Sequence, residues 1–218
     1  MSILKQGIIT VSGNNINDNI LLNSATLTGK DDSIINNNIT TGVHTGISGW
    51  KENRWSCSLD ALNNPLSGKK ITISLDFMCT DISKINAMVY GFGIIDNSNT
   101  RLSDVNLYVS SYSILDGSIA NNTWSRIYYV YTIPTDWATN GTKYILQIKT
   151  NSNANGITMY HKRIKVEISD HPTPWCISSS DYSFTQKNGF IENQNYNNPD
   201  INTKIGNGWI ACSNFNEI

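Results

Sequence analysis

The three histidines and the scattered carboxylates are the side chains of this chain that could perform acid–base or metal chemistry. A serine hydrolase needs a placed serine with a histidine base, and His44, His161 and His171 accompany no Gly-x-Ser-x-Gly turn. A glycosidase needs two carboxylates that face each other across the scissile bond, but most acids here lie at predicted turns or on outer strand faces. The histidines also lack the close spacing of zinc ligands. We therefore expect no catalytic residues and no enzyme.

Asp31 and Asp32 are the acids best suited to a cation, because they are adjacent in the loop segment 29–33. Calcium prefers carboxylate and carbonyl oxygens at about 2.3–2.6 Å. A structural Ca²⁺ at these two residues is the only cofactor that we consider. The alternative is a solvated acidic turn, and the sequence leaves both interpretations open.

Tryptophan side chains offer a different chemistry, since sugar binding needs flat aromatic faces with polar groups that read hydroxyls. Trp50 and Trp137 lie in predicted loops with polar neighbours, so we expect them to form an exposed platform. Asn53 and Tyr112 are expected to assist them. The alternative is that each tryptophan covers an edge of the core.

Alternation of apolar and polar residues predicts the strands that must position these side chains. In the clearest run, 70–79, Ile71, Ile73 and three further apolar residues share one face, while Thr72, Ser74 and Asp76 share the other. This pattern is typical of a half-buried strand. Further strands are predicted at 87–95, 124–132, 143–150 and 156–168, with shorter ones at 7–11, 19–22, 54–60 and 105–110.

Turn residues separate these runs, and no segment shows a sustained helical stripe with caps. Gly91 and Gly93 within their run indicate a bulge or a close backbone approach. Many short strands with regular turns predict an all-β fold, a β-sandwich of the jelly-roll type.

The domain organisation follows from shifts in composition. We expect an N-terminal arm at 1–18, a jelly-roll module at 19–177 and an extended polar C-terminal arm with a short terminal strand at 178–218. Two prolines, Pro172 and Pro174, stand near the second boundary. The alternative for the C-terminal arm is that it wraps on its own sandwich.

Charge and hydropathy exclude several classes of partner. Charged residues make up 15% of the chain and the net charge is −1. Lys and Arg are scattered, with no run beyond the short group Lys162-Arg163-Lys165, so we expect no nucleic-acid partner. No apolar stretch is long enough for membrane insertion, and the N-terminus does not read as a signal peptide. The four cysteines fit no zinc or redox spacing, and we expect all four to be reduced and structural.

Several short motifs resemble those of a known group of proteins. Asn19-Ile20-Leu21-Leu22-Asn23 is similar to the "N-L-L-x-N" opening of carbohydrate-binding-module-like jelly rolls, and Gly49-Trp50 is similar to a Gly-Trp that often follows it. The run 70–77 resembles that family's "Y-T-L-S-F-Y" strand, and 122–126 resembles its "g-x-W-t-r" strand opening.

The segment 164–175 resembles the "K-L-E-x-G-x-x-A-T-x-W-x-P" tail of phage tail and baseplate proteins, although Ser169-Asp170 replaces the glycine. Residues 214–218 resemble the "F-x-E-I" ends of phage fibre proteins. The motifs keep the family's order over residues 19–177. In this family Trp124 and Trp175 would pack in the core or at its edge.

The resemblance implies a non-enzymatic bacteriophage virion structural protein of the tail-fibre or receptor-binding type, with a glycan-binding jelly-roll module for host adhesion. The alternatives are a purely architectural capsid decoration or head-fibre protein without a ligand, and an accessory module of a carbohydrate-active enzyme. The implied partners are other virion proteins, further copies of the chain in a homotrimer, and host-surface or environmental glycans. The implied location is the virion, after synthesis in the host bacterial cytoplasm.

Overall fold

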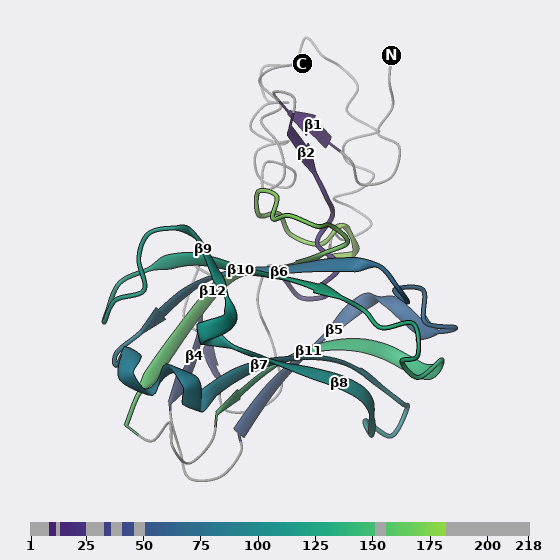
Figure 1. Cartoon of the computed structure of the whole chain (residues 1–218), viewed down its shortest axis with the longest axis horizontal. Helices are drawn as coiled ribbons and strands as arrows, with labels where there is room; N and C mark the ends of the chain where they lie inside the picture. Colours follow the sequence, from purple (N-terminus) through teal and green to yellow (C-terminus); the bar gives the residue numbers. More distant parts are fainter. Residues whose placement is uncertain are drawn as a thin grey trace.

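Two antiparallel sheets face each other and form a β-sandwich in the computed structural model of the chain (Figure 1). The structure describes residues 9–11, 14–24, 33–35, 41–45, 51–150 and 156–181, with side chains from 17–24, 54–150 and 156–181. The six-stranded sheet has the order β3-β4-β12-β6-β10-β9, and the four-stranded sheet has the order β5-β11-β7-β8. The expected β-sandwich is confirmed.

The elements, in chain order, are β1 (Ile9–Val11), β2 (Asn14–Ile16), β3 (Ser33–Ile35), β4 (Thr41–Thr45), β5 (Lys51–Leu62), β6 (Lys70–Cys79), η1 (Ile82–Ala87), β7 (Met88–Ile95), β8 (Arg101–Tyr108), η2 (Val109–Ser111), β9 (Ser113–Asp116), β10 (Ser125–Thr132), β11 (Asn140–Thr150), β12 (Thr158–Glu167) and η4 (Ser179–Asp181). β1 and β2 pair only with each other. The predicted strands that overlap β5, β6, β7, β8, β10, β11 and β12 are therefore confirmed. The strand expected at 19–22 forms only an isolated bridge between Leu21 and Cys57, and β2, β3, β4 and β9 were not predicted.

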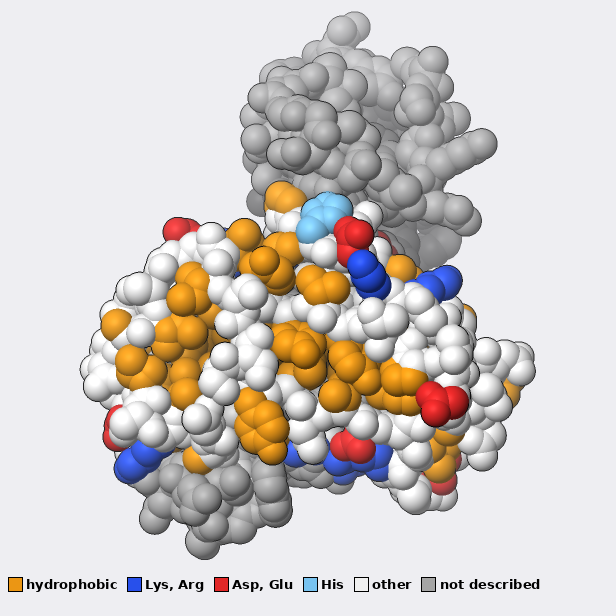
Figure 2. Space-filling model, viewed as in Figure 1, with side chains coloured by type: hydrophobic (Ala, Val, Ile, Leu, Met, Phe, Trp, Pro, Cys, Tyr) orange, Lys and Arg blue, Asp and Glu red, His pale blue; other side chains and the backbone are white. Residues whose placement is uncertain are grey.

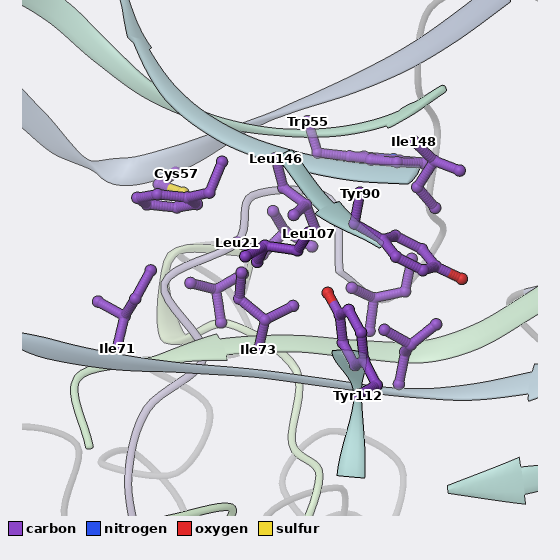
Figure 3. Packing of buried hydrophobic residues seen from close by; sticks show 14 of the residues in the cluster. Leu21, Trp55, Cys57, Ile71, Ile73, Tyr90, Leu107, Tyr112, Leu146 and Ile148 are labelled. Atoms are coloured by element: carbon purple, nitrogen blue, oxygen red, sulfur yellow. The ribbon is translucent and has the colours of Figure 1, made fainter. Parts of the chain in front are cut away.

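The core fills the space between the sheets. Figure 3 shows Trp55 and Leu146 from the four-stranded sheet facing Ile71 and Ile73 of β6, with Leu21 between the two layers. These side chains are almost fully buried. Period-two alternation places the strand residues on inner faces, so burial of their apolar surface is the main force that holds the layers together.

The outer face of β6 is also buried, which the sequence pattern did not indicate. Thr72, Ser74 and Asp76 are at most 4% exposed. Each is covered by groups from outside its own strand: Thr72 donates to the Ser169 carbonyl at 3.0 Å, and Arg126 donates to Ser74 at 2.8 Å. Alternation predicts which residues share a face, but it does not predict that a later segment crosses that face.

The covering segment is 168–181, which returns over β12 after the last strand and is joined by hydrogen bonds to residues 17–24, a segment that crosses from β12 to β5. Asn19 connects the two, since its side-chain amide donates to the carbonyls of Ile164 and Cys176 at 3.0 and 3.1 Å. The carboxylate of Asp181 accepts hydrogen bonds from both Asn23 and Ser24 at 2.7 Å. The open part of the outer face is therefore the opposite end, where β10 and β12 begin.

Glycines mark two tight contacts within the four-stranded sheet. A Cβ on Gly93 would lie 2.8 Å from the Ser103 carbonyl oxygen, so the close approach expected there is confirmed. A Cβ on Gly141 would lie 1.8 Å from Cγ2 of Ile94. Both positions exclude a side chain because the neighbouring strand or its core residue occupies the space.

Three of the cysteines, Cys57, Cys79 and Cys176, are buried and free, which confirms the expectation for them. Burial raises the pKa of the Cys57 thiol far above its usual value. Cys212 lies outside the described residues. The proposed arms at 1–18 and 178–218 remain predictions, since most of both lies outside the described side chains.

Apolar side chains gather on the side of the sandwich where β8 and β9 lie (Figure 2). Tyr108 of β8 is 49% exposed, and Ile114 and Leu115 of β9 are 48% and 53% exposed. β9 is an edge strand of its sheet. Exposed apolar edge strands are places where another chain can add.

Candidate functional site

Trp137, expected in the exposed platform, is a core residue in the structure. It is 9% exposed and stacks on Phe92 with ring centroids 6.4 Å apart and an interplanar angle of 20°. Tyr131 packs against it at 6.0 Å. The expectation of an exposed ring at Trp137 is therefore wrong, because the loop after β10 folds the indole over the end of the core instead of into solvent.

Tyr112, expected to assist the platform, is also buried. It is 6% exposed, and its ring packs 5.2 Å from Tyr90 and 5.7 Å from Tyr129. Burial raises the pKa of Tyr112 well above its usual value, and the nearby Tyr129 adds to the shift. A tyrosine that lies between two other rings offers no face to a ligand, so this expectation is corrected in the same way.

The remaining candidates lie wholly or partly outside the described residues. Trp50, Asp31 and Asp32 lie outside the described residues. Asn53 lies in β5 opposite Ile148, but its side chain is outside the described set. Glycan binding by Trp50 and Asn53 and calcium binding by the two aspartates therefore stay predictions. Within the described ranges, no group of three or more metal-ligating side chains is placed to hold an ion.

Two other aromatic rings do reach the surface, on the open end of the six-stranded sheet. Tyr160 of β12 lies directly opposite Met78 of β6, and the register of β10 carries Trp124 to the other side of Met78. Both rings are half-buried. Their centroids are 6.5 Å apart with an interplanar angle of 62°, an edge-on arrangement. Three adjacent strands thus place two aromatic rings in one row.

A row of charged residues follows, two residues away from the aromatic row on each of the same three strands. Asp76 of β6 lies between Lys162 of β12 and Arg126 of β10. The Lys162 ammonium lies 4.0 Å from the centroid of the Trp124 ring, a cation–π contact. Arg126 donates from Nη1 to Oδ1 of Asp76 at 3.2 Å.

Burial lowers the pKa of the Arg126 guanidinium; the Asp76 carboxylate opposes this shift and the Arg163 charge adds to it. A guanidinium stays protonated in proteins, so Arg126 remains a cation. Arg126 also donates to the Arg163 carbonyl at 2.6 Å. Arg126 is therefore a fixed, partly covered part of the site.

A bulge in β12 adds a third cation to this face. The register of β12 on β6 shifts between Lys162 and Lys165, and Arg163 within the shift has φ = +47°. Regular alternation would send Lys162 and Arg163 to opposite faces. Here Arg163 reaches Asp76 on the outer face, with Nε 2.6 Å from Oδ2. Its side chain remains 53% exposed.

We call this surface the aromatic–cation face and define it by Trp124, Tyr160, Lys162, Arg163, Arg126 and Asp76. Aromatic rings can stack on the apolar face of a sugar, and adjacent charged groups can hydrogen-bond its polar substituents. The sequence contained a signal for this site. Tyr160 and Lys162 alternate with buried residues, and Lys162 begins the basic group Lys162-Arg163-Lys165, which was considered only for nucleic acid.

The outer face of the four-stranded sheet carries a second polar network. Asp104 accepts a hydrogen bond from Arg101 at 2.7 Å and lies 3.8 Å from the Lys149 ammonium. Lys149 also donates to Asn106 at 2.9 Å. These charges bind one another, whereas no ion pair joins Lys162 to an acid among the described residues, and Arg163 uses only its Nε in its hydrogen bond to Asp76. The aromatic–cation face is therefore the better candidate for ligand binding.

Comparison with known proteins finds similarity at the level of the fold. No protein-family model and no curated protein matches the sequence. Among solved structures, the tripod from the baseplate of bacteriophage Tuc2009 is 21% identical with a TM-score of 0.46, covering 77% of this chain and 61% of the other. The chain therefore spans less than two thirds of that baseplate protein.

A family 30 carbohydrate-binding module of a Clostridium thermocellum cellulosomal cellulase is 13% identical, covers 76% of this chain and 88% of the module, and has a TM-score of 0.40. An α-L-arabinofuranosidase is 12% identical, with 70% of this chain and 26% of the enzyme covered and a TM-score of 0.37. The expected resemblance to carbohydrate-binding-module-like sandwiches is confirmed at the level of the fold. A fold does not by itself decide function.

The described residues contain no helix with the length and apolar character that crossing a membrane requires.

Proposed function

We propose that this chain is a non-enzymatic bacteriophage virion protein of the tail-fibre or receptor-binding type, which binds glycans through the aromatic–cation face. The observation that carries the glycan part is the row of Trp124 and Tyr160 beside Lys162 on the open end of the sheet. The order of the phage-like motifs over residues 19–177 supports the virion part.

Binding would proceed by stacking of a sugar ring on Trp124. The Lys162 ammonium now lies over that ring, 4.0 Å from its centroid. An exposed cation–π contact is worth about 0.5–1 kcal/mol, so a sugar can displace Lys162 at small cost. The displaced ammonium then becomes a donor to the sugar's oxygens. Arg126 and Asp76 bind each other, and this pair forms the surface on which the ligand would lie.

Each contact of this kind is weak, and attachment to a surface would depend on many copies acting together. We propose a homotrimer within the virion, to which the arm at 178–218 contributes contacts with other copies or other virion proteins. The exposed Ile114 and Leu115 on the edge strand β9 support self-association. Sedimentation equilibrium of the full chain measures the oligomer directly, and a monomer at all concentrations would contradict it.

The glycan proposal is tested with Trp124→Ala and Tyr160→Ala on a glycan array. Tyr108→Ala is the matched control, because Tyr108 is a 49% exposed aromatic residue on the other sheet. We expect loss of binding in the first two variants and unchanged binding in the control. Equal binding by all three variants would show that glycans do not bind at the aromatic–cation face.

The rival function is architectural, as a capsid decoration or head-fibre protein without a ligand. The exposed edge strand β9 supports this rival function, because an architectural protein needs contacts with other virion proteins and no ligand. It predicts that Trp124→Ala virions assemble and adsorb normally, whereas variants of β9 fail to assemble. The adhesin predicts intact Trp124→Ala virions with reduced adsorption.

A further inference from the structure

We infer that the ligand of the aromatic–cation face is an acidic polysaccharide, whose carboxylate or phosphate groups bind Arg163 and Lys162. This inference rests on the proposed function and specifies its ligand class.

The aromatic–cation face carries an excess of positive charge. Three cations, Lys162, Arg163 and Arg126, lie around the single carboxylate of Asp76. Of the described acids, the next closest in register is Asp116, which lies opposite Arg126 on β9 and accepts a hydrogen bond from the Gly117 amide. Counting both acids, the face keeps one excess positive charge on the side of β12, away from Asp116.

The cations of this face have hydrogen-bond donors that the protein does not use. Arg163 donates its Nε to Asp76, and no hydrogen bond joins its Nη atoms to another described residue. The guanidinium fork matches carboxylate and phosphate oxygens in a bidentate way. Arg163 is also 53% exposed, so an anion reaches it without displacing protein. The nearby Lys165 is different: it is fully buried and bound to Glu167 at 3.3 Å, and it offers nothing to a ligand.

The backbone of Arg163 has a left-handed conformation. A φ of +47° is the left-handed region, which non-glycine side chains adopt only at an energetic cost. Glycine would fit the same bulge without that cost. Bulges often re-aim a side chain next to a functional site, and strain that persists at an arginine is reason to suspect function. The bulge brings Arg163 to the same face as Lys162, which makes a pair of cations at one edge of the aromatic row.

The experiment uses pairs of polysaccharides that share a sugar backbone and differ chiefly in charge. Polygalacturonate is compared with its methyl ester for the carboxylate arm, and phosphomannan with mannan for the phosphate arm. Affinity electrophoresis of the full chain gives the retardation by each. We expect retardation by at least one acidic polymer, stronger than by its neutral partner and weakened by salt. The arm that responds identifies the anionic group.

Arg163→Gln should weaken binding to that acidic polymer about tenfold or more, which is the usual effect of losing a charge-assisted hydrogen bond. Arg163→Gly should weaken it equally while the midpoint of urea unfolding stays the same or rises, since the left-handed strain is relieved. Lys143→Gln, on the other sheet, is the charge-matched control and should leave binding unchanged.

The outcomes separate the two proposals. Equal binding of acidic and neutral polymers, with no effect of Arg163→Gln but loss in Trp124→Ala, would overturn the acidic ligand and keep glycan binding. No retardation by any acidic polymer would also overturn the inference. A lower unfolding midpoint in Arg163→Gly would remove the argument from strain.

Discussion

Asp76 binds Arg163 on the outer face of the six-stranded sheet, with Oδ2 of the carboxylate 2.6 Å from Nε of the guanidinium. The two side chains differ in burial, since that of Asp76 is 5% exposed and that of Arg163 is 53% exposed. The carboxylate also holds Arg126, whose side chain is 11% exposed. One buried acid therefore fixes two cations, and the energetic consequences of removing each partner should be unequal.

Asp76→Asn should lower the free energy of unfolding by about 3 kcal/mol, because it leaves the covered Arg126 without a counter-charge. Arg163→Gln should cost less than about 1 kcal/mol, because an exposed ion pair contributes little. Urea unfolding followed by tryptophan fluorescence measures both. Equal losses in the two variants would contradict the unequal burial of the cations.

Glu167→Gln should destabilise the protein by about 3–5 kcal/mol, because it leaves the fully buried Lys165 uncompensated. The carboxylate also accepts the Thr173 amide at 2.9 Å, so it ties the covering segment to β12. The double variant Lys165→Met with Glu167→Gln should recover most of the loss, since it removes the unpaired charge and retains an acceptor for Thr173. A double variant as unstable as Glu167→Gln would show that the charge is not the cause.

Trp137→Ala should lower the free energy of unfolding by about 3–5 kcal/mol through the cavity it leaves beside Phe92. Trp124→Ala should cost less, because Trp124 is only half-buried. Chemical denaturation of both variants gives the comparison. If Trp137→Ala kept its stability and lost glycan binding, Trp137 would be a platform residue after all.

Asp81→Ala should lower stability only above acidic pH. The pKa of Asp81 is lowered, chiefly by the hydrogen bond from the Ser83 hydroxyl at 2.6 Å. A lowered native pKa means that the stabilisation is present above the unfolded value of about 4 and is lost as pH falls through the native value. Thermal melts of wild type and variant should therefore differ at pH 7 and converge near pH 2. A constant difference over this range would contradict the assignment.

Much of the fold was predictable, because apolar alternation is a local property. The run at Lys70–Cys79 has the same bounds in the structure as in the sequence pattern. β9 escaped because its residues Ser113, Ile114, Leu115 and Asp116 are all exposed, and an exposed strand has no buried face to alternate with. The burial of Asp76 was also unpredictable, since it depends on Arg126 and Arg163, which lie on strands that neighbour β6 in the sheet but are far from it in the sequence.

The candidate site was less predictable than the fold. Polar neighbours suggested an exposed ring at Trp137, but a large apolar ring next to a core opening packs into it regardless of neighbours. Trp124 was assigned to packing, and the structure leaves it half-buried beside Tyr160. What brought these residues together was the register of three strands and one bulge, and neither is encoded in a local pattern.

The most direct test of the account is the affinity of the Trp124→Ala chain for the glycan that the wild-type chain binds best on an array. The account predicts at least about a tenfold loss for this variant, as for other stacked aromatic anchors, with the Tyr108→Ala control and the unfolding cooperativity unchanged. Wild-type affinity in a folded Trp124→Ala chain would contradict it.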